Sequence, residues 1–91
     1  MAKSMKQKKI DFCVYVKGLR VKKGLTQMDV ATKLGYANAQ FVSNWERGQC
    51  LPSVAALTTL SELYDVKLKD LFGRYMDTLR EDLWKKASGL M

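Results

Sequence analysis

The sequence predicts an all-α fold of five or six short helices. Apolar residues recur at three- and four-residue spacing along most of the chain, which is typical of amphipathic helices. Glycine, proline and small hydroxyl or amide residues stand where one such run ends and the next begins. With 91 residues, of which 47% are hydrophobic, the chain is long enough for one domain with a small core.

The first two helices have clear start and stop signals. The first is predicted from about Lys9 to Lys23, followed by Gly24 as a left-handed cap. Thr26 is a good N-cap for a second helix over residues 27–34, and Asp29 stands three residues later, where a capping box needs an acid. Gly35 is expected to end this helix.

Three further helical segments follow. Asn38 can cap a third helix over residues 39–47, which Gly48 ends. Pro52 and Ser53 mark the start of a fourth helix, whose apolar residues recur as far as Tyr64. A fifth begins near Leu68 and continues to about Lys86, and Gly73 leaves open whether it is one helix or two.

The net charge of +7 lies entirely near the N-terminus. Residues 1–24 hold eight basic side chains against Asp11 alone, and the rest of the chain is neutral. A localised basic surface attracts phosphate polyanions, although an arm that serves only solubility has the same composition. The predicted organisation is a basic arm (1–9), a helical domain (10–72) and a C-terminal helical extension (73–91).

Several function classes have no support in the sequence. There is no histidine, and Cys13 and Cys50 form no CxxC pair, so we expect neither an enzyme nor a metal site. Nothing suggests a cofactor or a small-molecule substrate. The absence of a secretory or membrane-spanning apolar run predicts a cytoplasmic protein with reduced cysteines.

The third predicted helix divides sharply into two faces. Phe41, Val42 and Trp45 cluster on one side. The other side carries residues at i, i+3, i+4 and i+7, namely Gln40, Ser43, Asn44 and Arg47. Glutamine and asparagine can pair bidentately with adenine in the major groove, and arginine with guanine.

The ordered set of motifs resembles the lambda-repressor-like, Cro-type helix-turn-helix family over about residues 10–72. The motifs are Leu19-Arg20-x-x-x-Gly24-Leu25-Thr26-Gln27-x-x-Val30-Ala31-x-x-Leu34-Gly35, then Val42-Ser43-x-Trp45-Glu46-Arg47-Gly48, Pro52-Ser53 and Val66-x-Leu68-x-x-Leu71-Phe72. The resemblance implies a five-helix domain that reads DNA with its third helix. It also implies a homodimer on a palindromic operator. The turn is one residue longer than usual, within Tyr36-Ala37, which affects the register of the first reading positions.

The resemblance also implies roles for single residues. Ala39, Gln40, Ser43 and Asn44 match base-reading positions. Gln27 and Arg47 match phosphate-contacting positions. Lys33, on the outer side of the second helix, is added either as a phosphate contact or as plain surface, and Asn38 is added because it could approach DNA if the third helix starts earlier. Arg20 and Glu46 match a partly buried salt bridge between the first and third helices, so we interpret Arg20 as structural rather than as a DNA contact.

Three aromatic residues around the turn have both structural and functional interpretations. Trp45 is expected in the core. Phe41 is expected to pack beneath the turn, with contact to a thymine methyl group as the alternative. Tyr36 could pack on the surface or donate its hydroxyl to a phosphate.

The sequence therefore predicts a sequence-specific double-stranded-DNA-binding protein, a transcriptional regulator of repressor type. The alternative is a protein-interaction module on the same fold, such as an antitoxin-like or accessory protein. The apolar residues between Leu68 and Leu83 motivate this alternative, because the second half of that segment exceeds what a small core needs. The same surface is a plausible dimer contact.

Overall fold

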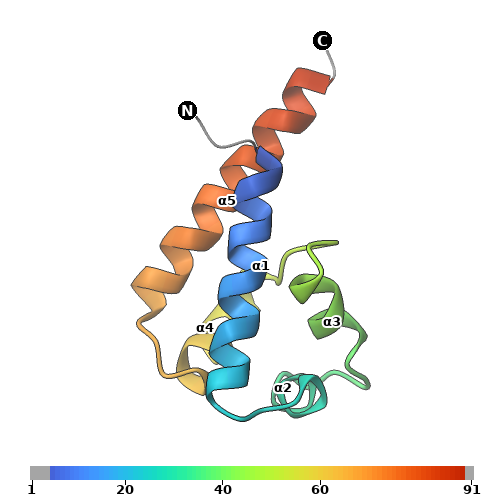
Figure 1. Ribbon diagram of the computed structural model, residues 1–91, viewed down its shortest axis with the longest axis vertical. Coiled ribbons are helices and arrows are strands. Elements are labelled where there is room, and N and C mark those ends of the chain that lie inside the picture. The colour runs from blue at the N-terminus through green and yellow to red at the C-terminus, as the bar shows by residue number, and fades with distance from the viewer. Residues whose placement is uncertain (1–4, 90–91) are drawn as a thin grey trace.

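The computed structural model describes residues 5–89 and contains five helices over that range (Figure 1). They are α1 (Met5–Lys22), α2 (Gln27–Lys33), α3 (Gln40–Glu46), α4 (Val54–Leu63) and α5 (Leu68–Gly89). The two long helices, α1 and α5, lie side by side, α4 packs on α5, and α3 contacts both α1 and α2. This part of the chain contains no strand, so the predicted all-α class is confirmed.

One core lies where α1, α4 and α5 meet and extends under α2 and α3. Leu57, Leu60 and Leu71 are fully buried at its centre. The ring of Phe12 in α1 meets Tyr75 in α5 edge to face, with centroids 5.9 Å apart. Burial of this apolar surface is the main stabilising contribution, because short helices are marginal in isolation.

Two predicted boundaries are wrong. The first helix begins at Met5 rather than near Lys9, because residues 5–8 contain good helix formers and no breaker. The last helix ends at Gly89 rather than near Lys86, and it is continuous through Gly73, where the sequence left a division open. An exposed glycine costs about 1 kcal/mol in a helix, which the burial of Leu71 and Tyr75 on either side of Gly73 outweighs. The expected role of the basic arm falls on residues 1–4, outside the described residues, and on 5–9, whose side chains are not described.

Side-chain caps hold the starts of α2 and α4. Thr26 and Asp29 form the complete capping box: the Thr26 hydroxyl accepts from the Asp29 backbone and the Asp29 carboxylate accepts from the Thr26 backbone. The second of these bonds holds the pKa of Asp29 below its ordinary value. Ser53 caps α4 by accepting from the backbone of Ala56. The N-cap of α3 is Ala39, one residue after the predicted cap.

The first four helices end in the same way. Each is followed by one residue with positive φ, and the next N–H reaches back to a carbonyl five residues earlier, as in the Schellman motif. Three of the positive-φ residues are glycines and the fourth is Asp65. The closing bonds run from Leu25 to Arg20, Tyr36 to Ala31, Gln49 to Asn44 and Val66 to Ser61.

Asp65 offers a test of this description, since its φ of 54° is unfavourable for a residue with a Cβ atom. We expect Asp65→Gly to be more stable than Asp65→Ala by about 1 kcal/mol in urea denaturation. Both variants lose the exposed Asp65–Lys23 ion pair, so that contribution cancels. Equal stabilities would mean that residue 65 does not keep its left-handed conformation.

Candidate nucleic-acid interface

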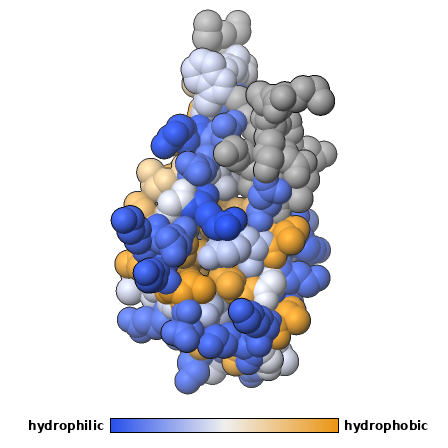
Figure 2. Space-filling view, turned by 60° about the vertical axis from the view of Figure 1, so that its left-hand side comes forward, coloured by the Kyte–Doolittle hydropathy of each residue, from blue (hydrophilic) through white to orange (hydrophobic). Residues whose placement is uncertain are grey.

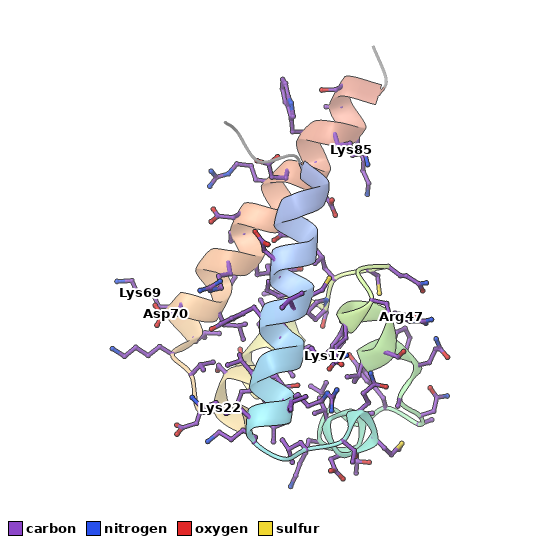
Figure 3. All side chains as sticks on the ribbon, viewed as in Figure 1. Lys17, Lys22, Arg47, Lys69, Asp70 and Lys85 are labelled. Carbon is purple, nitrogen blue, oxygen red and sulfur yellow. The ribbon has the colours of Figure 1, made fainter. Side chains whose placement is uncertain are left out.

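The outer face of α3 carries a chain of hydrogen bonds between polar side chains. The Oδ1 atom of Asn44 accepts from Nε2 of Gln40 and from Nη2 of Arg47, each at 2.9 Å. Gln40 and Arg47 are exposed, and Asn44 is half-buried between them. Arg47 lies on the side of α3 that faces away from α1 (Figure 3). Three of the predicted contact residues thus form one connected surface.

The opposite face of α3 fixes the helix to the core. Val42 is fully buried and Trp45 is nearly so, which agrees with the expected core role of the tryptophan. At the end of the helix, Gly48 comes so close to α1 that a Cβ atom would lie 3.1 Å from the sulfur of Cys13. These contacts leave the polar face of α3 as its exposed side.

A salt bridge joins α1 to the end of α3. Nε of Arg20 donates to Oε2 of Glu46 at 2.7 Å, and Nη2 donates to Oε1 at 3.0 Å. The third nitrogen of the guanidinium, Nη1, donates to the carbonyl of Leu25 at 2.8 Å. The structure therefore brings together the two residues that were expected to pair, in the bidentate geometry that arginine and carboxylate favour.

Gln27 completes this cluster from α2. Its Nε2 atom donates to Oε1 of Glu46 at 3.1 Å. Glu46 thus accepts three hydrogen bonds from two helices, and the hydrogen bonding of Arg20 to Glu46 raises the pKa of Arg20. The bond from Gln27 thus fixes the position of the start of α2 relative to the end of α3.

The hydroxyl of Tyr64 lies buried near this salt bridge and has no hydrogen-bond partner among the described residues. Burial raises the pKa of Tyr64, and the neighbouring Glu46 carboxylate adds to the effect. A buried hydroxyl without a partner costs about 1–3 kcal/mol. We therefore expect Tyr64→Phe to keep or increase the free energy of unfolding, by up to about 2 kcal/mol, in urea denaturation followed by circular dichroism.

Tyr36→Phe is the matched control, because Tyr36 is only half-buried and the same atom is removed. It should change stability by less than about 0.5 kcal/mol. A clear loss of stability in Tyr64→Phe would show that its hydroxyl has a partner in solution.

The remaining candidates lie in different places. Asn38 is exposed, and its Oδ1 atom accepts from the backbone N–H of Gln40 at 2.9 Å, which orders the bend before α3. Ala39 and Ser43 are half-buried beside the polar face. Lys33 is exposed but lines a shallow hollow next to α4, with Glu62 among its neighbours. The structure does not bring Lys33 together with the polar residues of α3.

Phe41 is not beneath the turn as expected. Its side chain is 55% exposed, although it stands between the buried Val42 and the polar Gln40. Its ring packs on Tyr36, with centroids 5.1 Å apart, and Tyr36 in turn meets Trp45 edge to face at 6.0 Å. Phe41 thus packs on a residue of the turn, but more than half of its surface stays exposed.

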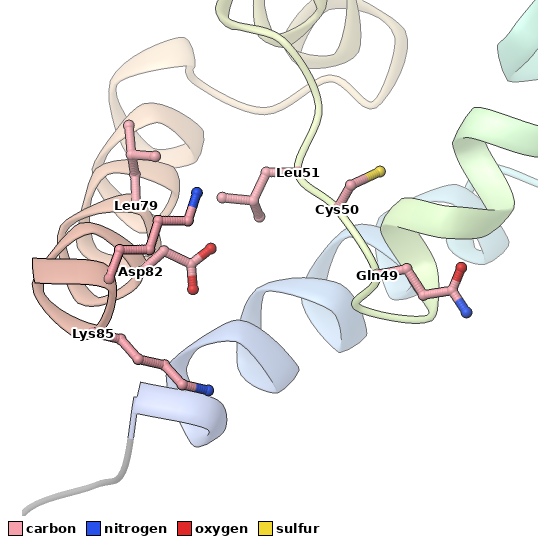
Figure 4. A pocket seen from close by; sticks show the side chains of 7 residues that line it. Gln49, Cys50, Leu51, Leu79, Asp82 and Lys85 are labelled. Carbon is pink, nitrogen blue, oxygen red and sulfur yellow. The ribbon is translucent and has the colours of Figure 1, made fainter. Parts of the chain in front are cut away.

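A further hollow lies elsewhere, between residues 49–51 and the C-terminal half of α5, with a volume of about 670 Å³ (Figure 4). Leu51 points toward Leu79 across it, whereas Gln49 points away from α5. Within residues 5–89 there is no cluster of three or more histidine, cysteine or acidic side chains suited to a metal ion. No helix in this range is long and apolar enough to cross a membrane.

Comparison with known families gives one match. The family model described as "Helix-turn-helix domain" matches residues 11–72, more than half of the chain. The chain belongs to the helix-turn-helix domain family. This agrees with the resemblance to lambda-repressor-like, Cro-type proteins. No curated protein and no solved structure matches the chain.

The helix-turn-helix unit consists of α2, the connection over residues 34–39, and α3. A unit of this kind is a DNA-binding element whose second helix enters the major groove. The bend over residues 37–39 precedes α3, so the longer turn leaves the helical spacing from Gln40 onward unchanged. Sequence reasoning missed the Gln27–Glu46 bond and the bonds to Asn44. The four-residue spacing of Gln40 and Asn44 was the available signal for one of them.

Proposed function

We propose that the protein is a cytoplasmic, sequence-specific DNA-binding regulator of transcription, of repressor type, that reads the major groove with α3. The observation that carries this proposal is the connected polar surface of Gln40, Asn44 and Arg47. Its amide groups match the donor and acceptor pattern of an adenine edge, and its guanidinium group suits a phosphate. A merely solvated helix face would more commonly mix lysine and glutamate.

The hydrogen bonds within this surface suit base recognition. Gln40 donates only one of its two amide hydrogens to Asn44, and its Oε1 atom has no partner among the described residues. The amide can therefore donate its second hydrogen to adenine N7 and accept from adenine N6. Asn44 would hold the Gln40 side chain in place for this contact, with Ala39 and Ser43 beside it in the groove.

Backbone contacts complete the proposed interface. Arg47 lies just past the end of α3 and is exposed, so it can reach a phosphate. Gln27 begins α2 and has a second amide hydrogen available beyond the one given to Glu46. Asn38 is the further candidate on this side, while Lys33 is less suitable because it lies beside α4.

We further propose that two copies bind a palindromic operator through contacts of α5. Phe72, Met76 and Leu83 are exposed and fall at spacings of four and seven residues, on one side of the helix. The end of α5 extends past α1 (Figure 1), where a second chain could reach it. On the face shown in Figure 2, apolar and hydrophilic side chains are mixed, which fits a modest contact rather than a large obligate one.

Selection of bound duplexes from a random DNA pool at near-physiological salt tests the proposal, because nonspecific phosphate attraction is weakened there. We expect a palindrome whose half-sites lie about one helical turn apart. A pool that stays random, with folded protein, would overturn the proposal and favour a protein-interaction module. Leu83→Asp provides the control for dimerisation. It should reduce binding to the palindrome while the monomer remains folded.

A further inference from the structure

We propose that Phe41 is a specificity-determining residue that contacts the 5-methyl group of a thymine next to the base read by Gln40. This inference rests on the proposed DNA-binding function and deepens it. It predicts that full affinity requires a thymine methyl group, which forms no hydrogen bond and so cannot be recognised by the polar side chains of α3.

The exposure of Phe41 is the first argument. A large apolar side chain is normally buried, and leaving it in water forgoes the stabilisation that burial gives. Phe41 keeps 55% of its surface exposed in a helix whose core contacts are already made by Val42 and Trp45. Its ring is therefore not needed to fix α3 and is available to a partner.

The second argument is that the ring is held in place. Tyr36 packs against Phe41 from the turn, and Trp45 packs against Tyr36 from the core, so the three rings form a continuous row. A braced aromatic side chain loses little conformational entropy on binding. This distinguishes Phe41 from isolated exposed residues such as Val21 in α1.

The position of Phe41 gives the third argument. It follows Gln40 directly in the first turn of α3, and by helical spacing it is about 60° around the helix from Asn44. It therefore borders the polar surface at the end of the helix nearest the turn. In the major groove an apolar ring at that place meets the apolar group that the groove offers, the thymine methyl.

The test replaces each thymine of the selected duplex, one at a time, by deoxyuridine, which lacks only this methyl group. For the wild-type protein we expect one position in each half-site to weaken binding about three- to fivefold, as for a lost buried methyl contact. In Phe41→Ala that deoxyuridine penalty should vanish, since the partner ring is gone. Val21→Ala, which also shortens an exposed apolar side chain, should keep the full penalty.

Each outcome distinguishes the inference from the function on which it rests. Selection of a palindrome with no sensitivity to deoxyuridine at any position overturns the role of Phe41 and leaves operator binding intact. A penalty that persists in Phe41→Ala assigns the methyl group to another residue and also overturns the inference. If Phe41→Ala weakens every duplex equally, the ring contacts sugar or phosphate instead. A random pool overturns both proposals. Thermal denaturation of each variant confirms that it is folded.

Discussion

Arg20→Ala should lower the free energy of unfolding by about 3–5 kcal/mol, a large part of the stability of a domain of this size. The substitution leaves the Glu46 carboxylate, of which 2% of the side chain is exposed, without its charged partner. Two of its three hydrogen bonds disappear, and only the one from Gln27 remains. Urea denaturation followed by circular dichroism measures the loss.

Two further variants show whether the burial of the pair is responsible. Lys23→Ala removes a basic residue from the same end of α1, but its partner Asp65 is 86% exposed, so the change should cost less than about 0.5 kcal/mol. The double variant Arg20→Met with Glu46→Leu removes both charges and should lose less than Arg20→Ala. If Arg20→Ala lowers the free energy of unfolding by less than about 1 kcal/mol, the structural role is contradicted. A DNA contact would then be the better interpretation of Arg20.

Asn44→Ala should have the largest effect on base preference. We expect the free-energy preference for the selected duplex over a scrambled one, obtained from the ratio of their dissociation constants, to fall by about 1–3 kcal/mol. The substitution removes the acceptor that holds both Gln40 and Arg47, so the effect should exceed the contribution of one side chain. Gln40→Ala combined with Asn44→Ala should therefore lose less than the sum of the two single variants.

Arg47→Ala, unlike Asn44→Ala, should change overall affinity and leave base preference unchanged. It removes a proposed phosphate contact, so both duplexes should be weakened alike and the slope of log affinity against log salt should decrease by roughly one unit. An unchanged ratio for Asn44→Ala, in folded protein, would exclude Asn44 from base reading.

The parts of the fold that depend on local chemistry are those that the sequence predicts well. The Thr26–Asp29 box and the left-handed Gly24 involve residues within a few positions of one another, so their patterns are visible in the chain itself. The start of α1 was mispredicted, and the sequence left open whether Gly73 divides α5. The good helix formers at residues 5–8 were given too little weight, whereas the continuity of α5 depends on the burial of Leu71 and Tyr75, which intrinsic preference alone does not determine.

In the candidate site, too, local patterns were predicted and contacts between distant residues were not. The polar spacing of α3 is a local pattern and predicts the surface formed by Gln40, Asn44 and Arg47. The bond between Gln27 and Glu46 joins residues nineteen positions apart, and no periodicity indicates it. The exposure of Phe41 was also missed, because an apolar residue four positions before a buried tryptophan is ordinarily expected to share its burial.

The shortness of α3 has a thermodynamic consequence. With seven residues, this helix is well below the length at which a peptide holds helical structure in water. Its outer surface therefore exists only while Val42, Trp45 and Glu46 are docked on the rest of the chain. Folding and DNA occupancy then become linked equilibria: a ligand that binds only the native state adds RT ln(1 + [L]/Kd) to its stability. A cognate duplex would thus raise the melting temperature of the protein, and a destabilised variant would need more DNA to reach the same occupancy.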